Sequence, residues 1–154
     1  MDPAPPPLRF VTRLTVRVAG PVDLGEFPTG RRRVVPILGG HATGPGVSGT
    51  IRPVGADTQT LRAPDVMELD AQYLIDTDDG AVIEVRNRGL RVASPSDTAA
   101  LLRGEPVPPT RVYFRTTPLL SADHPDWAWL SRTVFVATAV RQPEVVLVDV
   151  HRVD

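Results

Sequence analysis

The sequence contains no cysteine and no lysine, and aromatic residues are scarce. Without cysteine the chain forms no disulfide, uses no thiol in catalysis and offers no cysteine ligand to a metal. No apolar run approaches the ~20 residues that a membrane-spanning helix needs. Residues 1–7 also lack the basic start and apolar core of a secretory signal. These absences predict a cytoplasmic protein with no membrane partner.

The length and charge of the chain indicate one small domain. The chain has 154 residues and a formal net charge of −1. That length fits a single domain whose core needs neither disulfides nor metals. The near-neutral charge argues against binding to a phosphate backbone, so no nucleic-acid partner is expected. The proline-rich residues 1–8 predict a disordered lead-in, and residues 9–154 predict the folded domain.

Short extended runs, separated by glycine, proline and aspartate, predict an all-β fold. The expected strands cover 10–18, 31–38, 67–77, 81–88, 111–117, 133–140 and 145–153, with weaker candidates at 47–53 and 58–62. About eight short strands favour a single small antiparallel β-barrel over a sandwich, because closure removes exposed strand edges.

Two local signals support this interpretation. Asp78-Asp79-Gly80 separates two alternating runs, and Asp-Gly in that position is a strong hairpin signal. Ser94 and Pro95 suit the cap and first position of a helix, and Gly104 suits its end. The sequence therefore predicts one short helix near residues 95–103, lying across one end of the barrel.

A series of motifs along the chain is similar to the bacterial and fungal family called domain of unknown function 3237. The motifs, in order, are Gly30-Arg31-Arg32-Arg33, Gly39-Gly40, Gly44-Pro45-Gly46, Gly49, Gly55-Ala56-Asp57, Leu69-Asp70-Ala71-Gln72-Tyr73, Asp78-Asp79-Gly80, Asn87-Arg88-Gly89, Tyr113-Phe114-Arg115-Thr116-Thr117-Pro118 and Trp129-Leu130. The resemblance spans residues 10–152 and implies a barrel related in shape to allene oxide cyclases and dirigent proteins. Those barrels hold an apolar ligand in the lumen and steer its cyclisation without a cofactor.

The chain departs from the family pattern at three places. Thr58 stands where the family usually has tryptophan, Ala42 beside His41 where it has an aromatic residue, and Ser131 where it often has asparagine. If these positions line the lumen, each change enlarges it, and the chamber would accept a bulkier substrate.

Three polar residues are candidates for the lumen. Asp57 is interpreted either as a buried acid–base group with a raised pKa or as a carboxylate that caps a turn. Tyr73 and Asn87 share the apolar faces of the predicted hairpin. They either orient a substrate oxygen or bond to each other and fix the strand register.

Further candidates surround these three. Arg115 could stabilise an enolate or bind a carboxylate if it points inward. The alternative is an outward Arg115 paired with an acidic side chain, and the strand phase leaves both open. Trp129 and His41 are expected to shape the barrel mouth, although Trp129 could equally be a plug. Tyr113 and Ser131 complete the predicted substrate-binding set.

Other features are given structural interpretations. Glu68 and Asp70 share a strand face that looks solvated. Three scattered histidines lack the close spacing of a metal site, so no metal is expected. The glycine-rich stretch 39–49 lacks the strand, lysine and helix of a phosphate-binding loop, and it more simply supplies bends in the barrel.

These observations favour a cofactor-free cyclase, isomerase or related lyase that acts on an apolar, aromatic or polyketide-like molecule in secondary metabolite biosynthesis. Asp57 would move a proton, while Arg115 or Tyr73, with Asn87, would stabilise the oxygen that gains charge. Two alternatives remain open: a barrel that binds a small molecule without catalysis, and an interaction module filled by its own side chains. A homodimer is compatible with all three, because valine-rich outer faces favour pairing.

Overall fold

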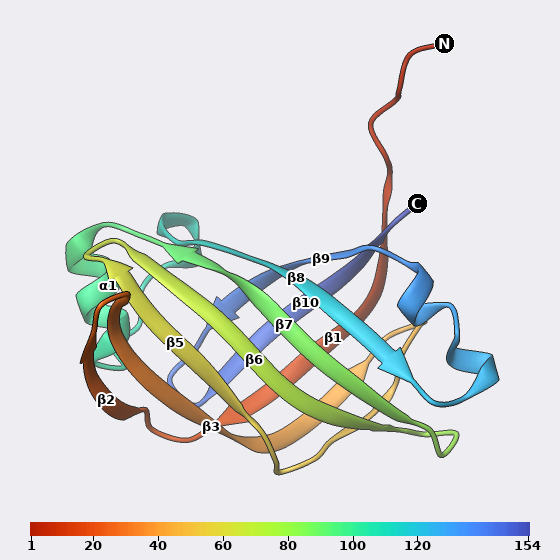
Figure 1. Cartoon of the computed structure of the whole chain (residues 1–154), viewed down its shortest axis with the longest axis horizontal. Coiled ribbons are helices and arrows are strands. Elements are labelled where there is room, and N and C mark those ends of the chain that lie inside the picture. The colour runs from red at the N-terminus through yellow and green to blue at the C-terminus, as the bar shows by residue number, and fades with distance from the viewer.

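The computed structural model describes residues 1–154 as one antiparallel β-barrel (Figure 1). The strands are β1 (Leu8–Val18), β2 (Val22–Phe27), β3 (Gly30–Thr43), β4 (Gly49–Ile51), β5 (Ala56–Ala63), β6 (Val66–Thr77), β7 (Val82–Val92), β8 (Tyr113–Ala122), β9 (Phe135–Arg141) and β10 (Val145–Val153). The helices are α1 (Pro95–Leu102) and the short 3-10 turns η1 (Pro109–Arg111), η2 (Pro125–Trp127) and η3 (Leu130–Arg132).

The ring closes through the first strand. β1 pairs with β10 along one edge and with β3 along the other, and the order continues from β10 through β9, β8, β7 and β6. β4 and β5 lie end to end and together form one strand position, in which each pairs with β3 on one side and with β6 on the other. β2 pairs with the first part of β3, beyond the end of β1. The barrel thus has eight strand positions, which confirms the predicted fold class.

The predicted hairpin is present. β6 and β7 pair along their length, from Val66↔Val92 to Asp76↔Val82. In the turn, the Thr77 hydroxyl accepts a hydrogen bond from the Ala81 N–H at 2.8 Å. Gly80 has a φ of 90°, which a residue with a side chain rarely adopts. The turn fixes the register that directs Tyr73 and Asn87 to one face.

The predicted helix is also present, at one end of the barrel (Figure 1). The Ser94 hydroxyl accepts a hydrogen bond from the Asp97 N–H at 3.1 Å, as expected of an N-cap residue. Thr98 and Leu101 are the buried residues of the helix. Because α1 covers this end, side chains pointing inward near it are shielded from water.

One strand face differs from the alternation expected from the sequence. A register shift between Phe10 and Thr12 interrupts the pairing of β1 with β10. Phe10 therefore stays exposed, while Val11 and Thr12 are both buried. A β-bulge of this kind changes which residues face inward, and period-2 counting does not detect it.

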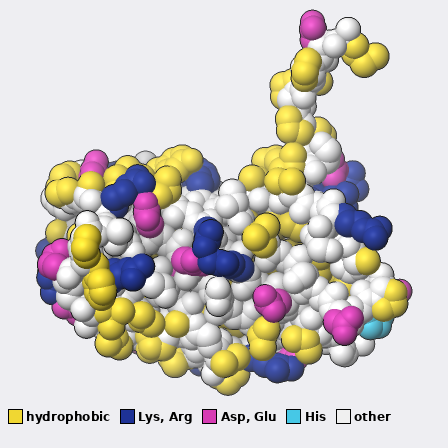
Figure 2. Space-filling view, in the orientation of Figure 1, with side chains coloured by type: hydrophobic (Ala, Val, Ile, Leu, Met, Phe, Trp, Pro, Cys, Tyr) yellow, Lys and Arg dark blue, Asp and Glu magenta, His cyan; other side chains and the backbone are white.

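The surface carries both signs of charge. Figure 2 shows basic and acidic side chains close together on the visible face, and residues 1–7 projecting from the barrel. Many form surface ion pairs, such as Arg13 with Asp149 and Arg52 with Asp76. None of the helices is long and apolar enough to cross a bilayer.

Candidate functional site

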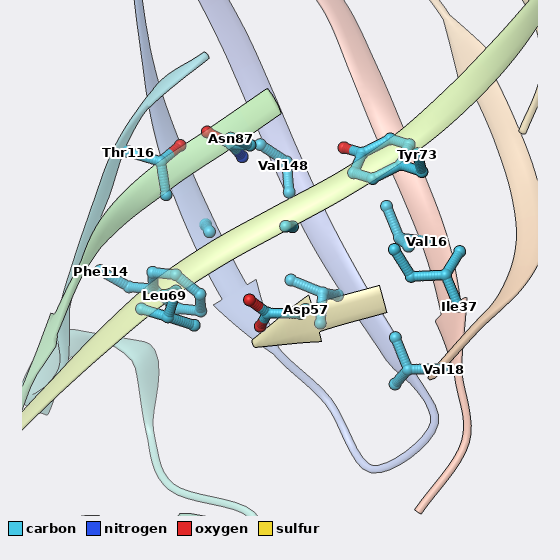
Figure 3. Close-up of a pocket in the computed structure, with 13 residues that line it drawn as sticks. Val16, Val18, Ile37, Asp57, Leu69, Tyr73, Asn87, Phe114, Thr116 and Val148 are labelled. Atoms are coloured by element: carbon cyan, nitrogen blue, oxygen red, sulfur yellow. The ribbon is translucent and has the colours of Figure 1, made fainter. Parts of the chain in front are cut away.

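A small chamber lies inside the barrel (Figure 3). Thirteen residues line it, of which ten are hydrophobic. They come from β1, β3, β5, β6, β7, β8, β9 and β10, so every position around the ring contributes. The polar members are Asp57, Asn87 and Thr116, and the Tyr73 side chain adds a hydroxyl.

The chamber is narrow. Its volume is about 50 Å³, whereas one water molecule occupies about 30 Å³ in the liquid and ligand pockets usually measure about 300–1,000 Å³. Side chains such as Leu14, Ile83 and Phe135 fill most of the interior. An aromatic ligand therefore requires the barrel wall to widen. The expectation of a spacious lumen is wrong, and of the four polar groups expected to converge, Asp57, Tyr73 and Asn87 line the chamber whereas Arg115 does not.

Asp57 faces inward from β5, opposite Ala71 of β6, which also lines the chamber. Its side chain accepts hydrogen bonds from the Gln59 amide at 2.7 Å and from the Asp70 N–H at 3.1 Å. Burial raises the pKa of Asp57, although these two hydrogen bonds and the nearby Arg91 and Arg33 act in the opposite direction. Asp57 therefore does not serve as a turn cap, and its carboxylate is a stronger base than a solvated one.

Tyr73, Asn87 and Thr116 supply polar atoms that have no hydrogen-bond partner within the protein. These atoms are the Tyr73 hydroxyl, the Asn87 side-chain oxygen and the Thr116 hydroxyl. Tyr73 and Asn87 therefore do not bond to each other. Burial raises the pKa of Tyr73, with a smaller contribution from Asp57, so its hydroxyl stays protonated at neutral pH.

The outer face of β8 holds Tyr113 and Arg115. Burial alternates along this strand, with Phe114, Thr116 and Leu120 inside. The Arg115 guanidinium donates to the Phe114 carbonyl at 3.0 Å and lies 5.2 Å from the centroid of the Tyr113 ring. The structure thus excludes both residues from the chamber and does not give Arg115 the acidic partner that was the predicted alternative.

Tyr113 and Arg115 instead border an outer groove of about 600 Å³ between β7 and β10. This groove is larger than the chamber but is open to solvent, where water satisfies its polar groups. The chamber is the stronger candidate site, because unpartnered polar atoms converge there and are shielded from water.

The other predicted mouth residues also lie away from the chamber. Trp129 packs on Phe135, with ring centroids 6.0 Å apart, so it is part of the plug at the end opposite α1. His41 and Ser131 are exposed, and Ser131 donates to the Ala128 carbonyl at 3.3 Å. Thr58 and Ala42 do not line the chamber either, so the departures from the family pattern do not enlarge it.

Sequence reasoning missed Thr116 and three inward arginines, Arg33, Arg91 and Arg141. Thr116 could have been found from the alternation of β8 once Leu120 is included, because Phe114, Thr116 and Leu120 then share an apolar face. No sequence pattern predicts burial of the three arginines, because charged residues are normally expected to be exposed to solvent.

The raised pKa of Asp57 predicts a pH-dependent stability. A raised folded-state pKa adds stability below the unfolded pKa, and this contribution is lost as pH rises through the folded value. Asp57→Asn removes that loss, so the difference in Tm, variant minus parent, should increase from pH 4 to pH 8. Scanning calorimetry measures it. Asp149→Asn, whose parent carboxylate has a pKa lowered by Arg13, should show the opposite slope, with most of the change below pH 4, and little change between pH 5 and pH 8.

Comparisons with known proteins agree with this architecture. The family model described as "Protein of unknown function (DUF3237)" matches residues 6–153. A UPF0311 protein of Rhodopseudomonas palustris is 43% identical over 145 residues, covering 94% of this chain and 95% of that protein. A UPF0311 protein of Clostridium acetobutylicum is 35% identical over 144 residues, covering 93% of this chain and 91% of that protein.

Solved structures show the same barrel. The crystal structure of the R. palustris protein of unknown function superposes with a TM-score of 0.92 at 41% identity, covering 100% of both chains. A protein described as an enzyme from Penicillium herquei has a TM-score of 0.74, covering 100% of this chain and 98% of that one. Its identity is 19%, so this likeness concerns the fold alone.

Proposed function

This chain belongs to the DUF3237 family, whose function is unknown. From the residues of the chamber we propose that the protein is a cofactor-free enzyme. The proposed reaction is a proton-transfer isomerisation or cyclisation of an apolar small molecule held in the chamber. Asp57 is the acid–base group. The Tyr73 and Thr116 hydroxyls and the Asn87 side-chain NH2 donate hydrogen bonds to the substrate oxygen that gains charge.

One observation carries this proposal: a buried carboxylate borders the same chamber as three unpartnered polar groups. A buried polar group without a partner costs about 1–3 kcal/mol, and a filled structural barrel gains nothing in return for that cost. In a site that receives a ligand, the two hydroxyls are ready to donate to a ligand oxygen, and the Asn87 side-chain oxygen can accept from a ligand O–H or N–H. The barrel described as a P. herquei enzyme supports the idea that this fold can host catalysis.

The proposed reaction is balanced without a co-reactant. The Asp57 carboxylate removes a proton from a carbon next to a substrate carbonyl; the electron pair of that C–H bond forms a carbon–carbon double bond, and the C=O π pair moves to the oxygen to give an enolate. The Tyr73 hydroxyl donates a hydrogen bond to the resulting enolate oxygen. Asp57 then returns the proton to another carbon or to an oxygen, so the product is an isomer of the substrate.

Proton exchange tests the proposal directly. Phenylpyruvate and phenylacetone both carry an aromatic ring and exchangeable hydrogens next to a carbonyl. We expect the protein to accelerate the exchange of those hydrogens for deuterium in D₂O, followed by ¹H NMR, on at least one of the two probes. Binding of either probe without faster exchange would favour the non-catalytic barrel, and no binding of either would favour the filled interior. Both results overturn the proposal.

Tyr73→Phe should slow this exchange about tenfold, which corresponds to the ~1.4 kcal/mol of one hydrogen bond. Asn87 and Thr116 remain in place and limit the loss. Tyr113→Phe is the matched control, because Tyr113 is the only other tyrosine and lies on the outer face. Equal rates for the two variants would remove Tyr73 from the proposed machinery.

A further inference from the structure

Three arginine side chains occupy inward-facing strand positions near α1. Arg33 comes from β3, Arg91 from β7 and Arg141 from β9. Each shares the face of its strand that holds a chamber-lining residue, namely Ile37, Asn87 and Ala139 respectively. The arginines therefore continue the inner wall of the barrel from the chamber toward the end that α1 covers.

These arginines differ from the others in their partners. Most arginines of the chain form ion pairs with carboxylates at the surface, whereas none of these three does. Arg33 donates to the Gln59 side-chain oxygen at 2.7 Å and to the Leu102 carbonyl at 3.4 Å. Arg91 is only 2% exposed, and its Nη2 has no hydrogen-bond partner. The Arg141 Nη1 is likewise buried and unpartnered.

Asp57 is the carboxylate that faces this group, and it does not neutralise the charge. Both its oxygens already accept hydrogen bonds, one from Gln59 and one from the Asp70 N–H. Burial, with the neighbouring Arg33 and Arg141, lowers the pKa of Arg91 to about 10, so Arg91 is still charged at neutral pH. Three cations thus face one carboxylate, and unpaired charge in a protein interior costs several kcal/mol.

The arginines adjoin the apolar chamber. Phe114 and Ala139 line both the chamber and a cavity of about 10 Å³ beside Arg141. The Arg91 guanidinium lies 5.8 Å from the centroid of the Phe114 ring. None of the three arginines lines the chamber itself, but Phe114 and Ala139 separate it from Arg141, so a molecule whose body lies among the apolar side chains would have its nearer end next to this group.

We propose that Arg33, Arg91 and Arg141 form a subsite for a carboxylate of the substrate. A planar carboxylate offers two oxygens that match the paired N–H groups of a guanidinium, and its charge offsets the excess of buried cations. The inference rests on the proposed function only in that both place the same molecule in the chamber.

The subsite would orient the substrate. With its carboxylate at the arginines, the apolar part of the molecule lies along Leu69, Ala71 and Val148, and the first carbons beyond the carboxylate lie beside Asp57. The substrate class is thus an apolar carboxylic acid with an acidic C–H close to its carboxylate.

Binding of two unreactive probes tests the subsite. trans-Cinnamate and cinnamide have nearly the same flat shape, differ in charge and have no exchangeable C–H hydrogens. We expect calorimetric titration to give cinnamate at least a tenfold lower Kd, in keeping with a charge-assisted bidentate contact. Arg91→Met should abolish this preference by weakening cinnamate alone. Arg132→Met, at an exposed arginine of η3 without an ion pair, is the matched control.

Two controls distinguish loss of the subsite from misfolding of the variant and from failure of the enzyme proposal. Arg91→Met removes one of several like charges, so the variant should unfold at the same temperature as the parent or higher; Arg141→Met provides a second test if it does not. Equal Kd values for the two probes, no binding of either, or an equal loss of both in Arg91→Met would overturn the subsite. A cinnamate preference without exchange catalysis would instead retain the subsite and reject the enzyme.

Discussion

Asp57→Asn should slow deuterium exchange into phenylpyruvate or phenylacetone by about 10²–10⁴-fold, the range in which positioned acid–base groups contribute. Asparagine keeps the size of the side chain and can still accept a hydrogen bond from Gln59 or the Asp70 N–H, but it has no basic oxygen to take the proton. Ligand affinity should change less than about tenfold, because Tyr73, Asn87 and the apolar wall are untouched. Single-turnover exchange by ¹H NMR and calorimetric Kd values measure the two quantities.

The control for this prediction is Asp126→Asn, since the Asp126 side chain is 82% exposed in η2. It should exchange the probes at the parental rate. The parental rate itself should fall as pH falls through the raised pKa of Asp57, because protonation removes the base. A full rate in Asp57→Asn, or a rate independent of pH, would mean that another group moves the proton.

Gly55→Ala should reduce the free energy of unfolding by about 4 kcal/mol, because overpacking against a neighbouring backbone costs about 1–3 kcal/mol and the left-handed conformation adds about 1–2 kcal/mol. Gly55 has a φ of 97°, and a Cβ at this position would overlap the Gln72 carbonyl oxygen. The close approach of β5 and β6 at this point places Asp57 beside the chamber. Urea unfolding, monitored by circular dichroism, measures the loss.

Gly80→Ala measures the cost of the positive φ alone, without the steric overlap that Gly55→Ala adds. Gly80 has a similar φ of 90°, but no atom lies within 4 Å of the position of its Cβ. Its replacement should cost only about 1–2 kcal/mol, the price of the left-handed backbone conformation. Similar losses in the two variants would show that the contact with Gln72 relaxes, and that β5 can move away from β6.

The sequence predicted the parts of this molecule that depend on local chemistry. The Asp-Gly turn fixes the β6–β7 hairpin, and Ser94 with Pro95 fixes the start of α1, because both act through neighbouring residues. Asp57, Tyr73 and Asn87 were found because each is a polar residue in an apolar or small-residue context. Their meeting in one chamber follows from the register of the hairpin and from the pairing of β5 with β6.

The parts that were missed depend on long-range geometry. The bulge in β1 moves Phe10 outward, and no local residue marks it. The direction of Arg115 depended on which alternate residues of β8 were apolar, and the count had to reach Leu120 to decide it. No prediction placed Arg33, Arg91 and Arg141 inside the barrel. They meet only because β3, β7 and β9 surround the same end of the barrel.

The double pairing of β1, with β10 on one side and β3 on the other, has a consequence for the order of folding. During synthesis β1 can find β3 early, but its second neighbour emerges only with Val145–Val153. Until then the nascent sheet carries two open edges, which are the features that make β intermediates prone to aggregation. The ring is thus completed by contacts of very high sequence separation, which form slowly. Substitution of a residue of β10 by proline or glycine should therefore lower the yield of folded protein more than the same substitution in β2.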